Sequence, residues 1–84
     1  MTAQTPKRVR LFVKPYCGWC HEAQDWLEAR EIPHEIIDVT ASASAWNEMK
    51  TLSRQTSAPV IEVDGEVLAD FGVDELESFW KQLP

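Results

Sequence analysis

Strand-like and helix-like patterns alternate along this chain, and their order limits the folds that it can adopt. A strand is predicted over 8–14, which is apolar at its centre, and Pro15 then removes a backbone donor. A helix is predicted over 18–31, where apolar residues recur at helical spacing. After Pro33, the β-branched run at 34–39 predicts a short buried strand beside the first one. These three segments make a β-α-β unit.

A hairpin is predicted in the second half of the chain. Residues 59–63 and 66–69 have the composition of short strands, and the dipeptide Asp64-Gly65 separates them. This dipeptide is favoured in two-residue hairpin turns because both of its positions tolerate a positive φ. The hairpin adds two antiparallel strands to the β-α-β unit.

Two more helices complete the pattern. One is predicted over 42–54, with Ser42 or Ser44 as its N-cap, and the other over 73–83. The order β-α-β-α-β-β-α predicts an α/β fold with a mixed four-stranded sheet and three helices, which is the smallest form of the thioredoxin-like fold. Core positions are predicted for three tryptophans on the apolar stripes of these helices, Trp26, Trp46 and Trp80.

The size and charge of the chain narrow its domain organisation and its partners. Its 84 residues suffice for one domain, predicted over 8–84 after a flexible tail at 1–7. The formal net charge of −6 argues against nucleic acid and anionic membranes as partners, because clustered Lys and Arg bind both. No apolar run has the length of a signal peptide or a membrane span, so the cytoplasm is the expected compartment.

The two cysteines of the chain, Cys17 and Cys20, lie at the predicted junction between the first strand and the first helix. A pair so close in sequence does not make a disulfide scaffold, so it suggests redox chemistry. Cys17 would occupy the N-terminus of the helix, where free backbone N–H groups and the helix dipole favour a thiolate and lower its pKa. Lys14 adds a positive charge nearby.

These positions predict different roles for the two sulfurs. A sulfur of low pKa leaves a mixed disulfide readily, so Cys17 is predicted to attack substrate disulfides. Cys20, one turn inside the helix, is predicted to resolve the intermediate. Two alternatives remain open at this point: the two cysteines are inert and buried, or they form a zinc site that His21 and His34 would have to complete.

Three separated segments give the chain a resemblance to the glutaredoxin family, which extends from about Arg8 to Leu83. The resemblance implies a glutaredoxin-type thiol–disulfide oxidoreductase with a glutathione-binding groove, in which Cys17, Cys20 and Lys14 form the catalytic group. The three segments are Lys14-Pro15-Tyr16-Cys17-Gly18-Trp19-Cys20-His21, Thr56-Ser57-Ala58-Pro59 and Phe71-Gly72-Val73-Asp74-Glu75-Leu76.

The resemblance also implies which residues hold glutathione. The Ala58-Pro59 bond would be cis, and Ala58 would offer its backbone N–H and C=O to the cysteinyl part. Val73 and Asp74 would bind the γ-glutamyl carboxylate through backbone N–H groups at the start of the last helix. The other residues implied in glutathione binding are Lys14, Tyr16, Trp19, Ser57 and Gly72.

Several positions depart from the family pattern. Gly18-Trp19 stands where many dithiol glutaredoxins have Pro-Tyr, and Phe71 replaces the first glycine of a Gly-Gly pair. Ala58 replaces a valine, and the basic residue usual before this segment has Arg54 as its nearest candidate. These departures weaken the match to the glutathione groove more than the match to the dithiol.

The sequence therefore predicts a glutathione-dependent reductase of protein disulfides and glutathione mixed disulfides that serves cellular redox homeostasis. Its expected partners are glutathione and disulfide-containing proteins, and no resident metal is expected. One alternative is a redoxin of the same fold that thioredoxin reductase reduces. The other is a dimer that binds a [2Fe-2S] cluster through Cys17 and glutathione, since Gly18 frees the backbone near the sulfur. Without a cluster, a monomer is expected.

Overall fold

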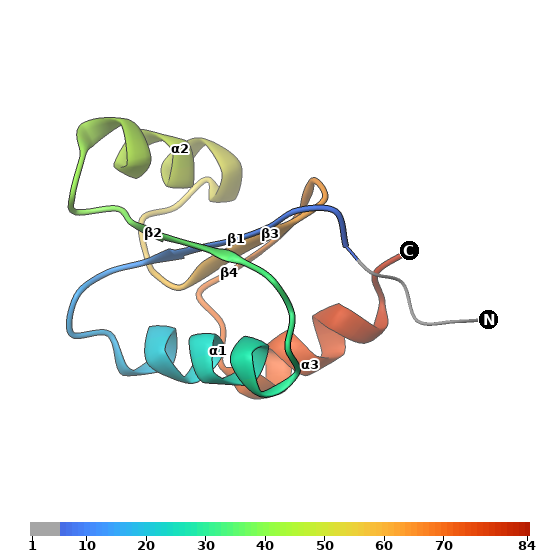
Figure 1. The fold of residues 1–84 in the computed structure, drawn as a ribbon. Coiled ribbons are helices and arrows are strands. Elements are labelled where there is room, and N and C mark those ends of the chain that lie inside the picture. Colours follow the sequence, from blue (N-terminus) through green and yellow to red (C-terminus); the bar gives the residue numbers. More distant parts are fainter. Residues whose placement is uncertain (1–5) are drawn as a thin grey trace.

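Residues 6–84, which the computed structural model describes, form a four-stranded mixed sheet with helices on both faces (Figure 1). The order of the elements is the predicted β-α-β-α-β-β-α, so the predicted α/β fold is confirmed. None of the helices in this part of the chain is long and apolar enough to cross a membrane. The elements are β1 (Val9–Val13), α1 (Gly18–Ala29), β2 (Glu35–Asp38), α2 (Ala43–Ser53), β3 (Val60–Val63), β4 (Glu66–Ala69) and α3 (Val73–Lys81).

The strand register brings three loops to one end of the sheet. The strands lie in the order β2-β1-β3-β4, with β1 parallel to β2 and antiparallel to β3, and β3 antiparallel to β4. Phe12 of β1 is paired with Val60 of β3, which is paired in turn with Ala69 of β4. The loop after β1, the loop before β3 and the loop after β4 therefore leave the sheet at the same end.

Strand β2 is not the buried strand that was predicted. It is an edge strand that pairs with β1 alone, and Ile36 is 41% exposed. A β-branched run favours a strand at an edge as well as at the centre of a sheet, so it does not determine burial. Helix α1 also ends earlier than predicted, at Ala29, and Glu31 beyond it has a positive φ of 56°.

Two apolar cores, one on each face of the sheet, hold the helices in place. Side chains alternate along β1, so Leu11 lies in the core beneath α1 and α3, whereas Phe12 lies in the core beneath α2. Figure 1 shows α2 alone on one face and the other two helices on the opposite face. Of the three tryptophans predicted for the core, Trp26 is buried, and Trp46 and Trp80 are half-buried against the two cores.

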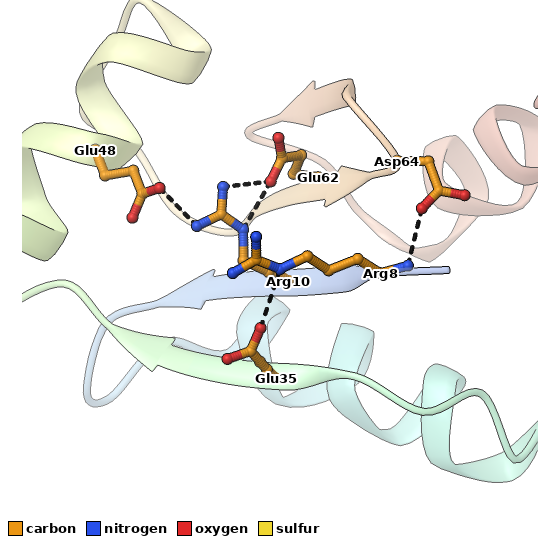
Figure 2. Close-up of polar contacts among 6 residues, drawn as sticks. All are labelled: Arg8, Arg10, Glu35, Glu48, Glu62 and Asp64. Carbon is orange, nitrogen blue, oxygen red and sulfur yellow. Dashed lines mark hydrogen bonds and ion pairs between the residues drawn. The ribbon is translucent and has the colours of Figure 1, made fainter. Parts of the chain in front are cut away.

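A buried arginine near the start of β1 ties α2 to the sheet. Arg10 is 7% exposed, and its guanidinium donates to Glu62 of β3 through Nε (2.7 Å) and Nη2 and to Glu48 of α2 through Nη1 (2.6 Å) (Figure 2). Burial acts to lower the pKa of Arg10, but the hydrogen bonds and negative charges of Glu48 and Glu62 outweigh it and raise that pKa. The two carboxylates therefore favour the charged form of the guanidinium.

The Asp64-Gly65 hairpin turn is confirmed, with φ values of 49° and 94° at its two central residues. The Asp64 carboxylate also accepts hydrogen bonds from the backbone N–H groups of Lys7 (3.1 Å) and Arg8 (2.8 Å). Figure 2 shows the Arg8 contact. The turn thus holds the chain just before β1, while residues 1–5 of the predicted tail lie outside the described residues.

Gly65→Ala is expected to lower the free energy of unfolding by about 1 kcal/mol, because a residue with a Cβ tolerates this positive φ poorly. Apart from Gly65 itself and its two chain neighbours, no residue has an atom within 4 Å of the position that the new Cβ would take, so the cost comes from the backbone conformation. Gly18→Ala is the control, since its Cβ also meets open space and its φ is not positive. Urea denaturation measures both variants, and an equal loss in both would contradict the assignment.

Candidate active site

The N-terminus of α1 gives the two cysteines different environments. Cys17 is the N-cap residue of α1, and its Sγ accepts a hydrogen bond from the backbone N–H of Cys20 at 3.1 Å. Cys17 is half-buried, whereas Cys20 is only 3% exposed. The two residues form a disulfide, with their Cα atoms 5.2 Å apart. Cys17 is therefore partly accessible and its sulfur lies where backbone N–H groups favour a thiolate, whereas Cys20 is shielded.

The turn before α1 and the first turn of α1 each expose one aromatic residue beside the dithiol. Tyr16 has a positive φ of 62°, which is uncommon for a residue other than glycine, and its side chain is fully exposed. Trp19, between the two cysteines, is 54% exposed. Both residues were predicted to line a substrate groove, and both lie on the surface where a partner can contact their rings.

Lys14 reaches from the loop after β1 to the loop before β3. Its Nζ donates a hydrogen bond to the carbonyl oxygen of Thr56 at 2.6 Å and lies 5.0 Å from the centre of the Trp46 ring in α2. The sequence placed this ammonium close to Cys17 in the chain but indicated neither contact, because Thr56 is 42 residues away. The hydrogen bond connects the first two segments of the family resemblance.

The loop before β3 contains a cis peptide bond between Ala58 and Pro59, as the resemblance implied. Pro59 is buried, and its carbonyl oxygen accepts a hydrogen bond from the backbone N–H of Asp70 at 2.8 Å. Ser57 is exposed, and its N–H donates to Oε1 of Gln55 at 2.7 Å. The contact with Asp70 connects this loop to the segment that leads into α3.

The start of α3 carries a carboxylate contact that the sequence analysis missed. Gly72 is the N-cap residue, so Val73 and Asp74 occupy the first turn as predicted. Oε1 of Glu75 accepts a hydrogen bond from the backbone N–H of Gly72 at 2.9 Å. In a capping box, the side chain three residues after the N-cap accepts a hydrogen bond from the N-cap backbone N–H, and this contact is that half of the motif. The three-residue spacing between Gly72 and Glu75 is the sequence signal that predicts it.

Asp74 and Glu75 also border a groove of about 380 Å³ along α3, which is completed by Leu68, Ser78, Phe79 and Gln82.

The three segments form one continuous region at the end of the sheet where their loops emerge. The histidines of the zinc alternative do not extend it: His34 Nδ1 lies 2.7 Å from the carbonyl oxygen of Ile32, and His21 is exposed on α1. Within residues 6–84, no group of three or more His, Cys, Asp or Glu residues is arranged to hold a metal ion. The chemistry of this region therefore centres on the two sulfurs.

Comparisons with known proteins agree with this arrangement. The glutaredoxin family model matches residues 9–68. An uncharacterized glutaredoxin-like 8.6 kDa protein in the rubredoxin operon of Clostridium pasteurianum is 28% identical over 69 residues, covering 82% of this chain and 92% of that protein. The crystal structure of the thioredoxin-like protein BC3987 matches with a TM-score of 0.78 at 27% identity, covering 84% of this chain and 97% of that one. The buckwheat glutaredoxin–glutathione complex has the same fold at 16% identity, with a TM-score of 0.69 and coverage of 87% and 67%. The chain belongs to the glutaredoxin family of thiol–disulfide oxidoreductases, with a thioredoxin-like fold and a dithiol of the Cys-x-x-Cys type formed by Cys17 and Cys20.

Proposed function

We propose that this protein reduces protein disulfides and glutathione mixed disulfides through Cys17 as nucleophile and Cys20 as resolving residue. The observation that supports it most is the contrast between the two cysteines: Cys17 caps α1 and is only half-buried, whereas Cys20 is 3% exposed. An accessible sulfur at a helix N-terminus is a good nucleophile at neutral pH and also a good leaving group. A shielded sulfur one turn away is close enough to bond to the first, so it can attack Cys17 once a mixed disulfide has formed there.

The reaction takes two exchanges. The Cys17 thiolate attacks one sulfur of the substrate disulfide, and the other sulfur leaves as a thiolate that takes up a proton. The Cys20 thiol then loses its proton and attacks Cys17, which releases the second substrate thiol and forms the Cys17–Cys20 disulfide. One disulfide is reduced to two thiols while the protein dithiol is oxidised. Two molecules of glutathione reverse the change in the protein and leave as oxidised glutathione.

Glutathione is the proposed reductant, bound across the three segments at the end of the sheet. Support comes from the cis Ala58-Pro59 loop, from the Val73 and Asp74 N–H groups in the first turn of α3, and from the family to which the chain belongs. We place the protein in the cytoplasm, where dithiols are kept reduced. The remaining residues assigned to this groove are Lys14, Tyr16, Trp19, Ser57 and Gly72.

The choice of electron source tests this function. Turnover of 2-hydroxyethyl disulfide is followed as NADPH consumption, once with glutathione and glutathione reductase and once with thioredoxin reductase. Glutathione is expected to support multiple turnovers. Turnover with thioredoxin reductase alone would contradict the glutathione assignment but leave the dithiol mechanism intact, and no turnover with either source would contradict both.

Glu75→Gln is expected to lower the KM for glutathione by about 2- to 5-fold at low ionic strength, because it removes a negative charge beside the proposed site of the γ-glutamyl carboxylate. The glutamine oxygen can still accept the hydrogen bond from Gly72. Glu77→Gln is the matched control, since Glu77 lies further along α3 and pairs with Arg30 at 3.9 Å. An equal change in KM in both variants, or none in either, would argue against carboxylate binding at this helix end.

A further inference from the structure

The contact between Lys14 and Trp46 brings α2 into the region around the dithiol. Lys14 Nζ lies 5.0 Å from the centre of the Trp46 ring while it donates to the Thr56 carbonyl oxygen at 2.6 Å. Trp46 itself is half-buried and packs against the α2 core, whose buried members are Phe12, Val39, Met49 and Val60. A ring that the core immobilises thus provides a fixed surface for a flexible cationic side chain.

We propose that Trp46 is a positioning residue that holds the Lys14 ammonium at the substrate groove and thereby makes the reaction of Cys17 selective for disulfides that carry a carboxylate. This inference rests on the proposed function, since it requires that Cys17 attacks substrate disulfides. It assigns to Trp46 a role that its place on the apolar stripe of a helix does not indicate.

The physical reason lies in the length of the lysine side chain. An ammonium on four methylene groups samples many positions, and its charge then acts weakly at any one of them. The aromatic face of Trp46 attracts the cation, and the Thr56 carbonyl fixes its direction. An ammonium has three donors and no acceptor, so after the bond to Thr56 it retains donors for a substrate carboxylate.

The Lys14 ammonium lies at the end of the sheet where the substrate is proposed to bind. Lys14 lies three residues before Cys17, and Thr56 lies three residues before the buried Pro59. The strand register brings these two loops to the same end of the sheet, and the ammonium bridges them there. A carboxylate on a disulfide that binds across these two loops would lie beside this charge.

The experiment uses two small disulfides of similar size, 3,3′-dithiodipropionate, which carries two carboxylates, and 2-hydroxyethyl disulfide, which is neutral. Fully reduced protein is mixed with each, and the second-order rate constant is measured by acid quench and chromatography of the released thiol. In each reaction the protein dithiol becomes a disulfide and the substrate becomes two thiols, so no other reductant is required. The readout is the ratio of the two rate constants, anionic over neutral.

Lys14→Met is expected to lower this ratio by about 5- to 10-fold at low ionic strength, through loss of the charge. Trp46→Leu is expected to lower it by about 2- to 5-fold, the range that an exposed cation–π contact supports. Trp46→Phe retains an aromatic face and is expected to restore most of the ratio. In the double variant Lys14→Met/Trp46→Leu, the ratio is expected to equal that of Lys14→Met alone, because Trp46 acts through Lys14.

The control is Arg30→Met, which removes the cation that lies 3.9 Å from the Trp26 ring, and it is expected to leave the ratio unchanged. A purely structural role of Trp46 would slow both disulfides equally, and that outcome would overturn the proposal. Additive effects in the double variant would overturn it too. If Trp46→Leu does not fold, Trp46→Met takes its place. A wild-type protein that reacts with neither disulfide would refute the proposed function instead.

Discussion

Serine at position 17 is expected to slow the reduction of every disulfide substrate by at least about 10³-fold, because a hydroxyl is a far weaker nucleophile than a thiolate at neutral pH. Cys20 cannot take over the attack, since it is only 3% exposed. Cys17→Ser should nevertheless fold, because position 17 is an N-cap and serine is among the preferred N-cap residues. The measurement is the rate of thiol release in a single turnover.

Cys20→Ser is the matched variant that separates attack from resolution. Its Cys17 should still attack oxidised glutathione and should then remain as a mixed disulfide, which mass spectrometry of the intact protein detects. The backbone N–H of residue 20 is retained, so the hydrogen bond to the Cys17 sulfur persists. If Cys17→Ser kept its rate, or if Cys20→Ser formed no mixed disulfide, the assigned roles would be wrong.

The elements that could be predicted from the sequence are those that local chemistry determines. The Asp64-Gly65 turn has the two positive φ values that its residue types favour. The side chains of β1 point alternately to the two faces of the sheet because a strand is pleated. The burial of β2 was predicted wrongly because it depends on which strands lie beside it. That order is set by pairing between distant segments, and Ile36 carries no information about it.

In the candidate site, too, the features that local sequence determines were predictable, and those that depend on distant segments were not. The dithiol was predictable because strand, turn and helix N-terminus are contiguous in the chain, so Cys17 and Cys20 take their places locally. The contacts of Lys14 with Thr56 and Trp46 join two loops and helix α2, and no spacing rule relates these segments. The contact between Glu75 and Gly72 is an intermediate case, because it was not predicted but follows a helix-capping pattern that is present in the sequence.

Arg10→Met is expected to lower the free energy of unfolding by about 2–4 kcal/mol, since removing one partner from a buried ion pair leaves the other charge without compensation. Arg10 was predicted only as part of a strand, and its role depends on Glu48 and Glu62, which are 38 and 52 residues away. The Glu62 side chain is 17% exposed and accepts from both Nε and Nη2 of Arg10. Urea denaturation of the oxidised protein measures the loss.

The two acidic partners should contribute unequally, and their difference tests the assignment. Glu48 is 45% exposed, so water can solvate its carboxylate, and Glu48→Gln is expected to cost less than about 1 kcal/mol. Glu62→Gln should cost more, because Glu62 lies in the sheet and is shielded by its neighbours. Replacing the buried pair together, as Arg10→Met/Glu62→Leu, should recover most of the stability lost in Arg10→Met, since neither charge then remains unpaired. A double variant no more stable than Arg10→Met would mean that the packing of the arginine side chain, rather than its charge, holds α2 to the sheet.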